Sequence, residues 1–296
     1  MEMPATTRPF NRRARVINAL LVGFCYVAAT LAIATLGLIF SYILYKGFSS
    51  LSLDFFTQLP GPPTAPHTGM KNAILGTVTL IVMASCLGVP VGMLCGIYLA
   101  EYARGGLFSN TVRAIVDILA GVPSIVVGVL GYELVVVNTG RYSAWAGALA
   151  LGFMMSPIIA RTTEELLKLV PQAYREASVG VGASQFQTLF RVVLPAARAG
   201  IITGIMLAVA RVAGETAPLL FTVLGSDQNA VVFSSHFPYV YPDVNQAFPS
   251  LTLQIFKYAT SPERDWIRQA WAGMLILIVI VTVLNLAVRY VSRSKR

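Results

Sequence analysis

The chain has 296 residues, of which 56% are apolar and 12% are charged, and its mean hydropathy is +0.69. A soluble domain carries about 25% charged residues, so this composition excludes a water-soluble globule. The net charge of +9 does not indicate a nucleic-acid-binding protein, because the basic residues flank apolar segments and do not form one polar patch.

Six apolar segments are long enough to cross a lipid bilayer as helices. The first is too long for the apolar part of a signal peptide and lacks a cleavage site, so we expect it to remain as a span. Pro123 interrupts the third segment, and the fourth is the shortest. The sequence predicts an all-α bundle of about six transmembrane helices, over residues 16–45, 73–100, 112–137, 143–160, 199–224 and 269–291.

The basic residues orient these spans, because the cytoplasmic loops of membrane proteins are enriched in Lys and Arg. With the N-terminus inside, 15 of the 22 Lys and Arg residues lie on the cytoplasmic side, six lie outside and one, Arg211, lies within a span. We therefore predict a multi-pass protein of the cell inner membrane with both termini in the cytoplasm. It has an N-terminal segment over 1–15, a membrane domain over 16–291 and a tail over 292–296.

Small residues recur at every fourth position of the second span, at Gly88, Gly92 and Gly96. Such spacing lets two helix backbones approach closely in a membrane, where no hydrophobic effect drives them together. The pattern predicts a packed bundle and carries no information on a substrate.

The long inner connection, 161–198, contains a predicted short helix. Pro171 favours the start of a helix, and Gly182 favours its end. Apolar residues follow before Pro195. A short helix with an apolar patch suits a groove on another protein. The alternative is a helix that lies on the membrane surface and anchors the loop.

The same connection carries a recognisable motif. Glu176-Ala177-Ser178-x-x-x-Gly182, followed after nine residues by Val192-x-Leu194-Pro195, resembles the EAA motif of ABC importer permeases. Ser178 stands for the second Ala of the usual motif and Val192 for Ile. The resemblance implies a MetI-like architecture, and it implies that this loop is a coupling helix that docks on an ATP-binding subunit through Glu176, Ala177, Gly182, Leu194 and Pro195.

The chain contains no G-x-x-x-x-G-K-[ST] loop for the phosphates of ATP. We therefore expect a transport subunit that is not an enzyme, with ATP hydrolysis in a separate polypeptide. The cysteines and the two histidines are isolated, and we expect no metal and no cofactor.

The fifth span contains a charge, Arg211, about midway along its length. A charge at the bilayer centre costs at least about 2.5–3.5 kcal/mol, so we expect Arg211 to face the interior of the bundle. Glu215 follows four residues later, on the same face of a continuous helix. Pro218 frees the carbonyl of Gly214 and predicts a kink or a local break.

Two interpretations of Arg211 and Glu215 stay open. In one, the two residues form an internal ion pair that offsets two buried charges. In the other, Arg211 faces the translocation path and helps an oxyanion across, while Glu215 holds its guanidinium in place. The paired donors of a guanidinium suit phosphate and sulfate.

Residues 210–220 and 117–128 are similar to the permeases of bacterial phosphate importers. The resemblance implies that the chain forms half of a translocation path for inorganic phosphate. It implies four kinds of contact: a second permease subunit, two copies of an ATP-binding subunit, a periplasmic or lipid-anchored phosphate-binding protein, and membrane lipid. It implies no nucleic acid.

Other functions remain possible from the residues. A permease for another oxyanion, sulfate or molybdate, shares the coupling loop and differs along the path. An ion-coupled secondary transporter needs no such loop and more often shows inverted repeats. The outer connection, 225–268, is rich in Pro and aromatic residues. It either docks a partner or caps the bundle.

Overall fold

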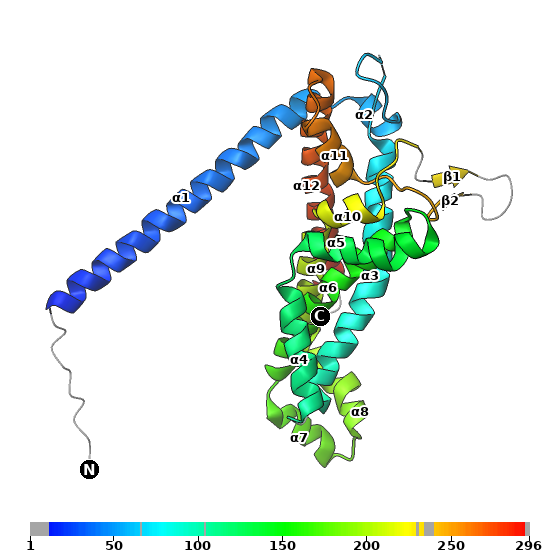
Figure 1. Cartoon of the computed structure of the whole chain (residues 1–296). Helices are drawn as coiled ribbons and strands as arrows, with labels where there is room; N and C mark the ends of the chain where they lie inside the picture. Colours follow the sequence, from blue (N-terminus) through cyan, green and yellow to red (C-terminus); the bar gives the residue numbers. More distant parts are fainter. Residues whose placement is uncertain (1–11, 66, 104, 229–230, 234–239, 294–296) are drawn as a thin grey trace, which may run out of the picture.

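The computed structural model describes residues 12–65, 67–103, 105–228, 231–233 and 240–293 (Figure 1). The described chain is helical apart from one antiparallel hairpin, β1 (Val231–Phe233) with β2 (Val240–Pro242). The long helices are α1 (Arg12–Ser50), α3 (Lys71–Ile97), α6 (Ala144–Lys168), α9 (Leu194–Ala213) and α12 (Arg264–Arg293).

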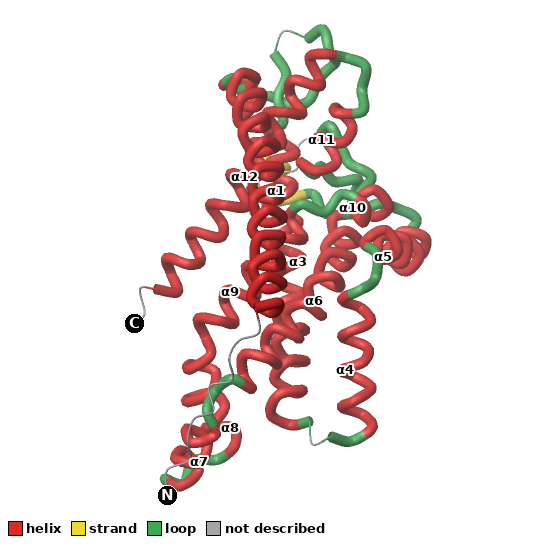
Figure 2. Tube along the Cα trace, turned by 90° about the vertical axis from the view of Figure 1, so that its left-hand side faces the viewer, coloured by secondary structure: helices red, strands yellow, loops and turns green. Residues whose placement is uncertain are grey.

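Shorter helices lie at the two ends of an elongated bundle and across its middle (Figures 1 and 2). One end, the α2 end, carries α2 (Leu53–Thr57) and α11 (Leu251–Ala259). The opposite α7 end carries α7 (Gln172–Gly180) and α8 (Gln185–Thr188). The remaining helices are α4 (Leu107–Ala120), α5 (Ser124–Gly131) and α10 (Ala217–Thr222). Three π-helical turns continue α3, continue α5 and precede α9: Tyr98–Tyr102 (η1), Tyr132–Val137 (η2) and Leu189–Val193 (η3).

The membrane-spanning helices agree with the predicted fold class. Five described helices are long and apolar enough to cross a membrane, and a sixth crossing results if the bent pair of α4 and α5 counts as one span. The chain bends by 104° between the two helices of that pair, so the predicted span 112–137 is broken. The break follows from Pro123, which has no N–H to donate and sits in an extended conformation before α5.

The fifth predicted span, 199–224, is also divided. Helix α9 ends at Ala213, and α10 begins at Ala217 after a three-residue break. The inner connection is shorter than predicted, because α6 continues to Lys168 and α9 already begins at Leu194. In the outer connection, residues 229–230 and 234–239 lie outside the described residues, as do 1–11 of the predicted N-terminal segment and 294–296 of the predicted tail.

The closest packing is between α3 and α6. A Cβ added to Gly88 or Gly92 would lie 2.6 Å from a backbone oxygen of α6, that of Gly152 or Ser156. At Gly96 the distance would be 2.5 Å. The two backbones are therefore in contact, and α3 and α6 form one stiff pair within the bundle.

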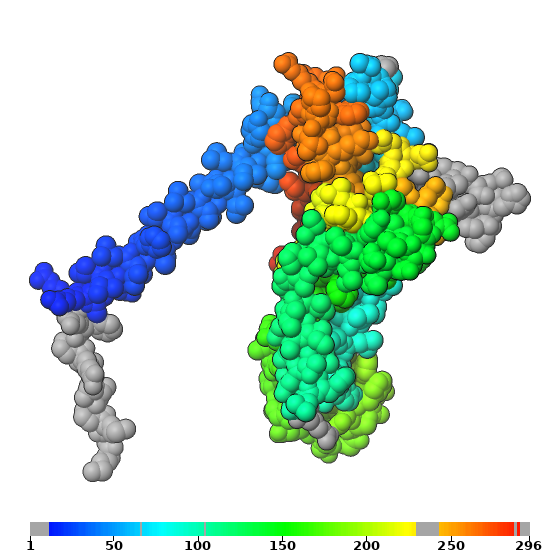
Figure 3. Space-filling view, in the orientation of Figure 1, coloured from blue at the N-terminus to red at the C-terminus, as the bar shows by residue number. Residues whose placement is uncertain are grey.

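Helix α1 stands apart from this bundle (Figure 3). None of its strongly apolar 18-residue window is buried by the rest of the described chain. It touches α12 only toward its C-terminal end, where Gly47 is buried and Tyr42 meets Trp271 edge to face at 5.1 Å between ring centroids. An apolar helix with this exposure has lipid or another subunit as its environment.

Candidate functional site

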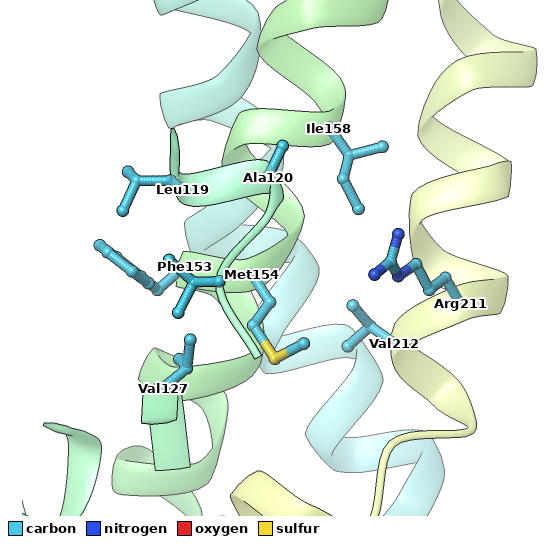
Figure 4. A pocket seen from close by; sticks show the side chains of 9 residues that line it. Leu119, Ala120, Val127, Phe153, Met154, Ile158, Arg211 and Val212 are labelled. Carbon is cyan, nitrogen blue, oxygen red and sulfur yellow. The ribbon is translucent and has the colours of Figure 1, made fainter. Parts of the chain in front are cut away.

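Arg211 lies in the last turn of α9, just before the break that leads to α10. Its guanidinium points away from α9 toward Met154 and Ile158 of α6 (Figure 4). The side chain borders a cavity of about 10 Å³, enough for about one water molecule. The other lining residues are mostly apolar: Leu119, Ala120, Val122, Val127, Phe153, Met154, Ile158 and Val212.

The cavity is built by two breaks that lie next to each other. The end of α4 supplies Leu119 and Ala120, the break after it supplies Val122, and the end of α9 supplies Arg211 and Val212. The half-helices that follow the breaks pack together, since a Cβ on Gly128 of α5 would lie 2.7 Å from the Cα of Pro218 in α10. Broken helices near the middle of a bundle are the usual setting for substrate sites in transporters.

The structure does not pair Arg211 with Glu215. Because α9 ends at Ala213, Glu215 lies in the break and not on the same helical face. Its backbone N–H donates to the carbonyl of Val212 at 3.1 Å, and its own carbonyl accepts from Thr252 at 3.1 Å. Within the described part of the chain, no ion pair joins the two side chains. Pro218 is buried in the first turn of α10.

The residues of the predicted coupling motif lie at the α7 end. Glu176 and Ala177 are exposed on α7, and Gly182 follows in a turn with a φ of +86°, a left-handed conformation that favours glycine. Leu194 and Pro195 form the first turn of α9, beyond α8 and η3. The structure therefore places both parts of the motif at one end of the bundle but on separate elements.

The surface around this motif is unusually apolar for a bundle end. Exposed side chains on α7, its following turn and α8 include Tyr174, Val179, Val181 and Phe186. Ser184 caps α8 in a reciprocal arrangement with Gln187, which fixes the direction of that short helix. An exposed apolar patch of this kind marks an interaction surface.

Beneath α7 the structure shows a contact that sequence analysis did not predict. Arg175 binds Glu101 of η1 at 2.5 Å and also donates to the carbonyls of Val170 and Leu167, at 2.8 and 3.0 Å. No local pattern identifies this pair, because the two residues are 74 positions apart.

A second unpredicted cluster surrounds Glu164, whose side chain is 1% exposed. Arg113 of α4 binds its carboxylate at 2.9 Å. Lys168, which lies in α6 together with Glu164, binds it at 2.5 Å. Arg161 lies 3.7 Å from it and also contacts Glu165 at 2.9 Å. These ion pairs join the N-terminal half of α4 to the C-terminal part of α6.

At the α2 end, the buried side chain of Asn72 holds the outer connection against α3. Its amide donates to the carbonyls of Ser226 and Gln228, at 2.8 and 3.0 Å. Just before this segment, Leu224 adopts a φ of 61°, an uncommon conformation for a branched side chain. In the sequence, the one indication of this role is an amide side chain at the start of the apolar segment that forms α3.

Comparison with known proteins identifies the class. The sequence profile of the family described as "Binding-protein-dependent transport system inner membrane component" matches residues 88–296. A solved MetNI methionine ABC transporter has a TM-score of 0.60 with 21% identity, covering 76% of this chain and 95% of that one. A bacterial ABC transporter that imports alginate has a TM-score of 0.64 with 15% identity, covering 95% and 99%. These structures share the fold with this chain. The chain is thus a multi-pass inner-membrane permease component, and not an ATPase.

Relatives at higher identity narrow this class. The phosphate transport system permease protein PstA of Yersinia pestis is 42% identical over 251 residues, which are 85% of this chain and 81% of that protein. The PstA protein of Xylella fastidiosa strain Temecula1 is 39% identical over 288 residues, 97% and 96% of the two chains. PstA 1 of Mycobacterium tuberculosis strain H37Rv is 34% identical over 301 residues, 99% and 94%. The chain belongs to the PstA family of binding-protein-dependent transport permeases.

Proposed function

We propose that this chain forms half of the translocation path of an ATP-driven importer of inorganic phosphate, with Arg211 as the residue that meets the anion. Membership of the PstA family supports phosphate as the substrate. The structural observation that carries the role of Arg211 is its position: a guanidinium that no carboxylate neutralises within the described residues, beside two adjacent helix breaks. A mobile oxyanion is the natural partner for such a group.

The cavity beside Arg211 is too small for phosphate in this conformation. Arg211 is itself exposed in the isolated chain, and we assign to an ATP-driven partner the movement that admits phosphate beside it. Glu215 lies in the break just after α9, and no ion pair joins it to Arg211 within the described residues. We assign it to the path and not to an ion pair.

The coupling motif supplies the drive. Helix α7 presents Glu176 and Ala177 to solvent, and the glycine turn at Gly182 leads to the apolar side chains on α8. We assign this surface to a groove on an ATP-binding subunit, with Leu194 and Pro195 receiving the movement at the start of α9. This assignment puts the α7 end in the cytoplasm, which agrees with the distribution of basic residues.

Partners follow from the other unpacked surfaces. The strongly apolar window of α1 packs on nothing within the described chain, and it suits a second permease subunit that completes the path. Two ATP-binding subunits then dock, one on α7 of this chain and one on the coupling helix of the second permease subunit. The α2 end faces the periplasm and receives the phosphate-binding protein.

The test is uptake of radiolabelled phosphate, sulfate and molybdate by cells that lack the gene and by the same cells carrying it. Phosphate uptake should return with the gene, and uptake of the other two anions should not change. Restoration of sulfate or molybdate uptake without phosphate uptake would identify the alternative oxyanion permease.

The coupling assignment has its own test. Gly182→Asp places a side chain where φ is +86°, and it adds a charge beside the docking surface. The variant should insert in the membrane but lose co-purification with the ATP-binding subunit. The matched control is Gly105→Asp, because Gly105 also has a positive φ and open space around it but lies outside the proposed docking helix.

A further inference from the structure

Arg175 is the one residue of the α7 docking helix whose side chain turns back into the bundle to bind a carboxylate within the described residues. Its side chain is 17% exposed, whereas its neighbours Tyr174 and Glu176 are open to solvent. It reaches the carboxylate of Glu101 and two carbonyls at the C-terminal end of α6, those of Leu167 and Val170. Three partners outside α7 hold this one guanidinium.

Each of these bonds is of the stronger kind. A guanidinium that binds a carboxylate makes a charge-assisted hydrogen bond, about twice as strong as a neutral one. The bonds from Arg175 to the carbonyl of Leu167, which also accepts from the N–H of Val170, and to the carbonyl of Val170 in the turn after α6 are charge-assisted as well. Glu101 lies in the π-helical turn η1, an irregularity that often marks a functional position.

The connection between α7 and α9 is built differently. It runs through the glycine turn at Gly182, the four-residue helix α8 and the π-helical turn η3. The direct contact between α7 and α8 side chains is a hydrogen bond between the hydroxyls of Ser178 and Thr188, at 2.9 Å. A cavity of about 350 Å³ lies between η1, α7 and α8, which leaves α7 room to tilt toward or away from α8.

We propose that Arg175 and Glu101 form a rigid link that makes α7 move as one body with the ends of α3 and α6, so that force on the docked α7 reaches both central helices. Arg175 is a positioning residue in this role. The inference rests on the proposed docking of α7, and it specifies which helices follow the docked helix.

The link explains how movement reaches the substrate. Helices α3 and α6 are locked together by their glycine contacts, so they move as a pair. Helix α6 supplies Phe153, Met154 and Ile158 to one wall of the cavity beside Arg211, and α9 supplies Arg211 itself. Displacement of α7 therefore moves the α6 wall of this cavity.

The experiment uses the complete transporter with Cys25, Cys86 and Cys95 replaced by Ala, reconstituted in liposomes with its partners. Glu101→Cys and Arg175→Cys are introduced together, and a short, reducible bis-methanethiosulfonate reagent bridges the two thiols. Phosphate uptake and ATP hydrolysis are measured on the same preparation before bridging, after bridging and after reduction.

Without the bridge, ATP hydrolysis should continue while phosphate transported per ATP falls about tenfold, since a hydrogen bond to a charged group shifts an equilibrium by roughly this factor. Bridging should restore the ratio, and reduction should abolish it again. A residue that only supports folding would not respond to a reversible bridge. The matched control is Ser178→Cys with Thr188→Cys, where the same reagent joins α7 to α8, leaves Arg175 and Glu101 in place and should leave the ratio unchanged.

Two results would overturn the link: an unchanged ratio in the unbridged variant, or loss of uptake when the thiols at positions 101 and 175 are bridged. If the double variant fails to assemble, Glu101→Gln gives the same measurement, since it keeps the side-chain size and the carbonyl bonds of Arg175. Co-purification of the ATP-binding subunit reports docking separately. If Gly182→Asp still binds the ATP-binding subunit at the wild-type level, the coupling assignment is wrong. The link between Arg175 and Glu101 is then tested separately by the amount of phosphate transported per ATP.

Discussion

Arg211 lies in the last turn of α9, and Glu215 lies beyond the end of that helix. The i,i+4 placement of the two residues on one helical face requires a continuous helix through both, and α9 ends between them. In this conformation Arg211 borders the cavity lined by α4, α5 and α6. Glu215 lies in the break between α9 and α10. Both interpretations that the sequence left open place the two side chains in contact, and no such contact is present among the described residues; the role of Arg211 in the path stays a prediction.

We expect Arg211→Gln to abolish most phosphate uptake while the subunit still assembles, because the change strands no carboxylate partner. Arg211→Lys should recover part of the uptake, since Lys keeps the charge and loses the paired donors. The measurement is uptake normalised to the amount of assembled transporter, with Arg141→Gln on the outer surface as the control. Near-normal uptake by Arg211→Gln with Glu215→Gln would show that Arg211 only balances a charge.

Glu164 provides a contrast within one helix. Its carboxylate is buried and meets three cations, whereas Glu165 next to it is 60% exposed and binds Arg161 alone. Removing one partner from a buried ionic cluster costs about 3–5 kcal/mol, and an exposed pair contributes at most about 1 kcal/mol. We expect Glu164→Gln to lower the thermal unfolding temperature of the purified subunit far more than Glu165→Gln. Equal effects would mean that the cluster is not a structural joint.

At the scale of the element, the glycines of α3 set the distance between the two central helices. A Cβ at Gly92 would lie 2.6 Å from the carbonyl oxygen of Ser156, so a methyl group there forces the helices apart. Overpacking of this kind costs about 1–3 kcal/mol. Gly92→Ala should lower the unfolding temperature in detergent, whereas Gly23→Ala, with open space around it on α1, should not. An unchanged temperature for Gly92→Ala would contradict the close packing.

Local signals in the sequence predicted elements better than contacts. Apolar length identified the spans, and the fourfold spacing of Gly88, Gly92 and Gly96 indicated close helix packing. Pro123 marked the interruption of the third span, but its angle depends on how α5 packs on α10, which no local pattern specifies. The pairs Arg175 with Glu101 and Arg113 with Glu164 join residues 74 and 51 positions apart. Several other cations were equally available to each carboxylate, so only the fold selects the partner.

At the scale of the whole molecule, orientation remains a prediction from charge. The proposed function requires the α7 end in the cytoplasm and the α2 end outside. With the native cysteines replaced, a membrane-impermeant maleimide added to intact cells should label Glu263→Cys and should not label Ser184→Cys, both of which are exposed positions. Labelling of position 184 alone would place the coupling helix on the wrong side of the membrane for an ATPase.

The isolated position of α1 has a consequence for biogenesis. A helix whose apolar surface touches little of its own chain is stable in lipid alone, because lipid tails satisfy apolar side chains as well as a protein partner does. Such a subunit can complete its insertion before it meets any partner. Until then α1 is exposed along its length, and a quality-control protease can recognise an unassembled copy by this free helix. Production in excess of the partner subunit should therefore shorten the lifetime of the surplus, and a partner that covers α1 should restore it.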